Sequence, residues 1–263
     1  LDPEKVLLYR QSDVPETFEL STFLMGFTSK GMMNKAHAYK AAVDVNAEKG
    51  KDKDVGINMG LYTYPVLMAA DILLFDTDIV PVGKDQKQHV EITADIAQKI
   101  NHIYKEELLR IPTPISSEST QLIPGMDGRK MSKSYDNTIP LFLAPKKLKK
   151  MINKIVTNSQ EMEEKKDPEI CNVFALYKLF ATQEQQDILA ERYRAGGLGW
   201  GHAKTELFNV IEEHFAEKRT HYEELMVDKT YLDKVLQEGA TKARAIAQET
   251  IKRLRKAAGI GVQ

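Results

Sequence analysis

The chain has 263 residues, which is long enough for one large domain or two ordinary ones with a substantial core. Its hydrophobic content of 42% and charged content of 29% are ordinary for a soluble globular protein. The net charge of −1 lacks the basic excess typical of nucleic-acid-binding proteins. The apolar runs fall short of a membrane span and the single cysteine excludes an internal disulfide, so we expect a cytoplasmic protein with no membrane partner.

The first half of the chain alternates short apolar runs with helical stretches. Val6 to Tyr9 is predicted as a buried strand; little chain precedes it, so we expect a truncated N-terminus. A second strand is predicted over 78–82. Helices are predicted over 16–27, 34–46, 64–75 and 85–100. Pro65 would then lie in a first helical turn, where proline is tolerated. Strands that alternate with helices are typical of a parallel α/β sheet.

The second half changes character near residue 140. No strand is predicted beyond about Leu143, and the periodicity is helical throughout. The predicted helices cover 145–156, 173–180, 183–194, 203–222 and 231–258. We therefore expect a parallel α/β part followed by an all-helical part, with the last helix packing back on the first part.

The sharpest motif is Lys130-Met131-Ser132-Lys133-Ser134, which follows a glycine-containing turn over 125–129. Two lysines three residues apart, with a hydroxyl between them, suit a polyphosphate, because each ammonium can reach charge that develops on a leaving pyrophosphate. For a generic loop of lysine and serine, an exposed basic turn would be the preferred interpretation. This pentapeptide, however, matches letter for letter the KMSKS element of class I aminoacyl-tRNA synthetases.

A second set of residues shares one face of the helix predicted over 64–75. Tyr64, Met68 and Asp71 stand at i, i+4 and i+7. An aromatic ring and a thioether there are usually plain core, but a carboxylate is costly to bury without a donor. The donor could be an internal Arg or Lys, or a ligand N–H. An indole has one N–H donor and no acceptor, which a carboxylate would suit.

A third segment, over 80–89, ends a strand at Gly83 and begins a polar helix. Open α/β sheets bind ligands in this position, beyond the carboxyl ends of their strands. Gly83 would allow close backbone approach, the helix N-terminus would favour an anion, and Asp85 could accept from ribose hydroxyls. The competing interpretation is an ordinary turn with Asp85 as helix cap.

Together these segments resemble bacterial tryptophanyl-tRNA synthetases, most densely from Gly60 to Ser134. The resemblance implies an α/β fold class: an incomplete Rossmann-like catalytic domain over 1–140, then a helical tRNA anticodon-binding domain over 141–263. Position 84 is Lys where many members carry Glu. The family's first strand and its His-x-Gly-His-like element are absent, so we expect the N-terminal part of the ATP site to be missing.

The resemblance also implies roles for individual positions. Asp71 would accept the indole N–H, while the other amino-acid contacts would line the ring pocket (Met68, Val80, Val82) or hold the ammonium and carboxylate end (Tyr64, Gln86). The ATP contacts would be at the ribose (Gly83, Asp85), at the adenine (Met131), and at the phosphates, where the catalytic residues are expected (Lys130, Ser132, Lys133).

In that family the tryptophan carboxylate attacks the α-phosphorus of ATP, and the acyl group then passes to tRNA(Trp). The resemblance implies that Mg²⁺ is bound through the ATP phosphates rather than by a protein metal site. It also implies a homodimer when intact, and we expect the isolated chain to be weakly active or inactive. Two alternatives stay open: a tyrosyl-type synthetase, and a non-catalytic tRNA-binding protein derived from a synthetase.

Overall fold

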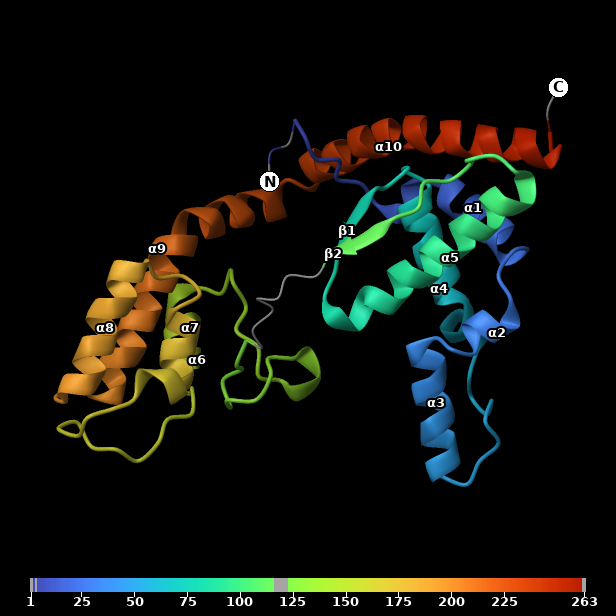
Figure 1. Ribbon diagram of the computed structural model, residues 1–263. Coiled ribbons are helices and arrows are strands. Elements are labelled where there is room, and N and C mark those ends of the chain that lie inside the picture. The colour runs from blue at the N-terminus through green and yellow to red at the C-terminus, as the bar shows by residue number, and fades with distance from the viewer. Residues whose placement is uncertain (1, 3, 116–122, 262–263) are drawn as a thin grey trace. The chain divides into compact units, whose positions relative to one another are not determined.

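The structure, a computed structural model, describes residue 2 and the ranges 4–115 and 123–261 (Figure 1). The chain divides into two compact units, Leu1–Thr120 with Thr230–Gln263, and Gln121–Lys229. The expected ranges 1–140 and 141–263 divide it differently, since residues 123–140 group with the helical unit and the last helix groups with the first unit. The roles of catalytic and anticodon-binding domain stay predictions.

The first unit is built mainly from helices around one apolar core. Its elements are η1 (Gln11–Asp13), α1 (Glu16–Met25), α2 (Lys30–Met33), α3 (His37–Glu48), α4 (Met59–Leu73), β1 (Ile79–Pro81), η2 (Lys84–Gln86), α5 (Lys87–Tyr104), β2 (Thr113–Ile115) and α10 (Lys229–Ala258). Helices α1, α4, α5 and α10 each bury apolar residues in the same core, for example Leu24, Leu73, Ile96 and Ala247. Helix α10 runs alongside α1 (Figure 1), and the expectation that the last helix packs on the first part is confirmed.

The sheet of this unit consists of β1 and β2, which pair in parallel with Val80 opposite Pro114. Asp78 fixes the pair at its start: its carbonyl accepts from Thr113 N at 2.9 Å, and its carboxylate accepts from Arg110 Nη1 at 2.7 Å. The predicted strand over 78–82 is confirmed, whereas β2 was not predicted, because it is only three residues long and contains a proline.

The strand predicted at Val6–Tyr9 is wrong. These residues form neither helix nor strand, and Val6, Leu7 and Leu8 are exposed rather than buried. An apolar run becomes a strand only when a neighbouring strand satisfies its backbone, and none of the described residues pairs with this run.

Helix α4 begins five residues earlier than predicted. Asn58 caps it, because its side-chain oxygen accepts from Leu61 N at 2.9 Å. Pro65 therefore lies inside the helix and not in its first turn, so the helix lacks one hydrogen bond to the Leu61 carbonyl. Burial of the surrounding apolar face in the core stabilises the helix despite that loss.

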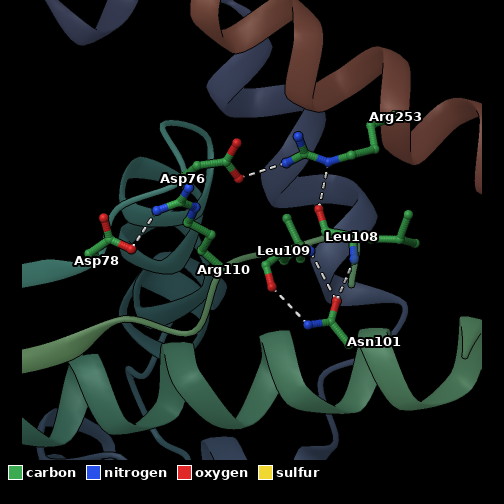
Figure 2. A network of polar contacts seen from close by, with 7 residues as sticks. All are labelled: Asp76, Asp78, Asn101, Leu108, Leu109, Arg110 and Arg253. Atoms are coloured by element: carbon green, nitrogen blue, oxygen red, sulfur yellow. Dashed lines mark hydrogen bonds and ion pairs between the residues drawn. The ribbon is translucent and has the colours of Figure 1, made fainter. Parts of the chain in front are cut away.

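A polar network joins α10 to the loops that lead into both strands (Figure 2). Arg253 donates from Nη2 to Asp76 Oδ1 at 2.6 Å and from Nε to Leu108 O at 2.7 Å. Asp76 is held there in the left-handed backbone region, at φ 47°. Asn101 of α5 accepts from Leu108 N and Leu109 N at 3.0 Å each. The network thus fixes the chain just before β1 and on the approach to β2.

The second unit contains η3 (Lys133–Tyr135), α6 (Pro145–Ile152), η4 (Pro168–Ile170), α7 (Asn172–Tyr177), α8 (Gln183–Ala195) and α9 (Trp200–Val227). Their core includes Leu148, Phe174, Tyr193 and Leu207. The predicted fold class is confirmed, since the parallel sheet lies in the first unit and the named elements of the second are all helical. No helix within 4–115 or 123–261 is long and apolar enough to cross a membrane.

Candidate active site

The KMSKS segment follows a tight turn in the second unit. Pro124 and Lys130 face each other across an antiparallel bridge, and Gly125 N donates to Arg129 O at 2.7 Å. Lys130 and Lys133 are exposed, and neither ammonium bonds to another residue that the structure describes. Both cations are therefore available to an anionic ligand.

Asn137, which sequence reasoning did not single out, holds this loop in shape. Its side chain is buried and donates from Nδ2 to Asp127 Oδ1 at 2.7 Å and to Lys130 O at 3.1 Å, while Oδ1 accepts from Ser132 N at 2.8 Å. A Cβ on Gly125 would lie 2.2 Å from Asn137 Nδ2, so only glycine allows this approach. The turn and the KMSKS backbone are thus joined through one amide.

Other side chains of the loop make their contacts within the second unit. The Asn137 amide and then Arg129 hold the pKa of the Asp127 carboxyl below its ordinary value. Arg129 bonds to Asp127 at 2.6 Å and also lies over the Tyr135 ring. Met131 packs against the hydrophobic core of the unit, and its expected contact with adenine stays a prediction.

We expect Asn137→Ala to destabilise the loop by about 2 kcal/mol, because the part-buried Ser132 N–H loses its acceptor while Asp127 and the Lys130 carbonyl each lose a donor. Amide hydrogen exchange should then speed up at Ser132. The control is Asn153→Ala, an exposed asparagine just after α6 of the same unit, which should change stability by less than about 0.5 kcal/mol. Unchanged protection at Ser132 would contradict this account of the loop.

The residues of α4 that are expected to contact the substrate amino acid lie in the first unit. Tyr64, Met68 and Asp71 are all partly buried. The Tyr64 hydroxyl lies 3.0 Å from Nε2 of His89 on α5. The Asp71 carboxylate accepts from Gln11 Nε2 at 2.7 Å to each oxygen. Burial raises the pKa of Asp71, and the bond from Gln11 opposes that rise.

His89 of α5 is a buried histidine that packs against Tyr64. Burial, and then the neighbouring His37, lower the pKa of His89, which favours the neutral ring. Its Nδ1 has no partner among the described residues. No group of three or more acidic, histidine or cysteine residues in 4–115 and 123–261 could hold a metal.

The carboxyl end of β1 brings together the expected ribose contacts. Val80 lies in β1 and Val82 follows it, both partly buried. A Cβ on Gly83 would lie 2.8 Å from Asp85 Oδ1, so the carboxylate lies directly against the glycine backbone. Gln86 donates to the Asp85 carboxylate at 2.9 Å. Its expected role, to hold the ammonium and carboxylate end of the amino acid together with Tyr64, stays a prediction.

Comparison with known families decides the assignment. The family described as tRNA synthetases class I (W and Y) matches residues 1–216. The chain belongs to that family. Its relatives in this class I family include the tryptophan–tRNA ligase of Pseudomonas putida, 49% identical over 99% of this chain and 58% of the relative. The ligase of Neisseria meningitidis serogroup A is also 49% identical, over 99% of this chain and 77% of the relative. The chain thus spans little more than half the length of the first of these.

Solved structures of the same class I family agree. Tryptophanyl-tRNA synthetase of Campylobacter jejuni, complexed with ADP and tryptophan, superimposes with a TM-score of 0.88 and 46% identity over 99% of this chain and 79% of that one. The enzyme of Mycoplasma pneumoniae gives a TM-score of 0.72 and 28% identity over 99% of this chain and 78% of that one. These neighbours confirm the Rossmann-like class expected from the sequence.

Proposed function

We propose that this chain is the part of a tryptophan–tRNA ligase that carries the KMSKS loop and the tryptophan pocket. The observation that carries the proposal is the loop itself, in which Lys130 and Lys133 are exposed, bond to no other described residue and project from a backbone fixed by Asn137. Relatives that are 49% identical and are described as tryptophan–tRNA ligases support the same reaction.

The loop residues would act on the phosphates of ATP. The tryptophan carboxylate attacks the α-phosphorus, the bond to the bridging oxygen breaks, and pyrophosphate leaves with that electron pair. Lys130, Ser132 and Lys133 would stabilise the negative charge that develops on pyrophosphate, beside a Mg²⁺ carried by the ATP phosphates. Gly83 and Asp85 would contact the ribose, which their close approach at the end of β1 supports.

The amino-acid side of the site would be formed by α4 and β1. Asp71 would accept the indole N–H, and the ring would lie against Met68, Val80 and Val82. Tyr64 and Gln86 would hold the ammonium and carboxylate groups. A ring without an N–H would cover the open lone pairs of the half-buried Asp71 carboxylate without giving them a donor, which costs free energy, so the pocket would reject such a ring.

The acyl group would then pass to tRNA(Trp), with the helical residues 141–263 as the anticodon-binding domain. Homodimer formation and a cytoplasmic location belong to the same proposal, as what membership of this family would imply.

The proposal is tested by amino-acid-dependent exchange of pyrophosphate into ATP, with tryptophan and tyrosine compared. The assay is run on this chain and on the full product of the coding sequence that contains it. Exchange with tryptophan alone would support the proposal. Exchange with tyrosine would assign a tyrosyl-type enzyme, and none with either would favour a non-catalytic tRNA-binding protein.

In the active protein we expect Asp71→Ala to lower kcat/KM for tryptophan about 10- to 150-fold, the value of one hydrogen bond to a charged group. An analogue in which sulfur replaces the indole N–H should lose nothing by the same change. Asp95→Ala, an exposed aspartate on α5, provides the control. Equal losses for tryptophan and the sulfur analogue would remove Asp71 from its proposed role.

A further inference from the structure

Among the described residues, Gln11 donates a hydrogen bond to Asp71, the residue proposed to accept the indole N–H, although sixty positions separate the two in the sequence. Its Nε2 lies 2.7 Å from both carboxylate oxygens, so this donor sits between the two oxygens. A carboxylate has about four lone-pair directions, and a donor between the oxygens leaves the outer ones open. A second N–H donor can therefore bind the same carboxylate while Gln11 remains in place.

The chain around Gln11 is fixed on both sides, so the amide is presented from a defined position. The Tyr9 ring packs against Phe75, with ring centroids 5.7 Å apart. Val14, just after the η1 turn, is fully buried in the core. Arg10 bonds across to Asp233 of α10 at 3.3 Å.

The electrostatics of Asp71 also depend on this contact. Burial disfavours the charged carboxylate and raises its pKa, and the Gln11 hydrogen bond opposes that effect. Among the described residues, Tyr9 lies close enough for the charge of Asp71 to act on its hydroxyl: burial, and then the Asp71 charge, raise the pKa of Tyr9. No cation from the described residues bonds to the Asp71 carboxylate, so the neutral amide is its hydrogen-bonding partner.

We propose that Gln11 is the positioning residue of the tryptophan pocket, whose amide holds the Asp71 carboxylate so that its free oxygen lone pairs accept one ring N–H. The inference rests on the proposed function for the identity of the ligand, an indole. Its chemical basis is simple: an ionised carboxylate can only accept, whereas a protonated one could donate and would lose the preference for an N–H donor.

The first test needs no ligand. Carboxyl carbon NMR of the chain follows the titration of Asp71 with and without Gln11→Leu, which keeps the bulk and removes the donor. The pKa of Asp71 should rise in Gln11→Leu, because only the burial effect remains. The matched control is Gln98→Leu, the same change at an exposed glutamine of α5, which should leave the Asp71 titration unmoved.

The second test measures L-tryptophan binding by titration calorimetry. Gln11→Leu should weaken binding about tenfold or more, and should narrow the difference between tryptophan and the sulfur analogue that lacks the N–H. Gln11→Glu should bind weakly when both carboxyls are ionised. It should recover as the pH falls and the pair takes up one proton, because that proton then replaces the amide donor.

The outcomes separate the inference from the function on which it rests. If the unsubstituted protein binds tryptophan but Gln11→Leu leaves both the Asp71 titration and the discrimination unchanged, the inference is overturned and the proposed function stands. If the unsubstituted protein binds no tryptophan, the proposed function fails, and the assignment of Gln11 to an indole pocket fails with it.

Discussion

Replacing Lys133 with alanine should slow tryptophan-dependent ATP–pyrophosphate exchange about 10²- to 10³-fold, the usual loss when one preorganised charge-stabilising donor is removed. The reason lies in its surroundings. Its ammonium is exposed and bonds to no other described residue, so the charge is free to act on an incoming phosphate. Arg129, in contrast, is already paired with Asp127 at 2.6 Å and cannot replace it.

The same reasoning predicts what Lys133→Ala leaves intact. Folding should change by less than about 0.5 kcal/mol, because the Lys133 side chain is exposed and its ammonium bonds to no other described residue. Tryptophan affinity should also be unchanged, since the proposed pocket residues belong to the first unit. Lys165→Ala, an exposed lysine elsewhere in the second unit, is the control and should retain full exchange. A Lys133→Ala protein with normal exchange would remove the loop from the proposed chemistry.

The sequence predicts the site best where the residues are contiguous. The five residues of the KMSKS element are consecutive and can be recognised directly in the sequence. Helical spacing is enough to put Tyr64, Met68 and Asp71 on one face of α4. The residues that hold these side chains in place are harder to predict from the sequence. Asn137 has no pattern that marks it as buried, because its three side-chain bonds go to loop atoms whose positions exist only after folding. Gln11 reaches Asp71 across sixty positions, which no local period can indicate.

The errors in the predicted elements have the same origin. Helix boundaries depend on caps, and the Asn58 cap moved the start of α4 and placed Pro65 in its interior. The apolar run at Val6–Tyr9 was predicted as a strand from composition, yet strand formation depends on a partner. Its Tyr9 ring instead packs against Phe75.

Gly239 explains how that run is held, and it provides the second large prediction. Helix α10 crosses the run so closely that a Cβ on Gly239 would lie 1.9 Å from Leu8 O and 2.8 Å from Leu8 C. We expect Gly239→Ala to destabilise the first unit by about 3 kcal/mol, the upper end for overpacking, because the obstacle is backbone and not the end of a flexible side chain. The gain of about 1 kcal/mol in helix propensity is too small to offset the overlap.

Urea denaturation measures this effect, and Gly201→Ala is the matched control. Gly201 also lies in a helix, α9, but a Cβ there meets nothing within 4 Å, so that variant should be as stable or about 1 kcal/mol more stable. The run that Gly239 contacts leads directly into Gln11, so displacing it should also weaken the hold on Asp71. Gly239→Ala should therefore lower tryptophan affinity together with stability. A loss of stability with unchanged affinity would show that the Leu8 contact supports the fold but not the proposed pocket.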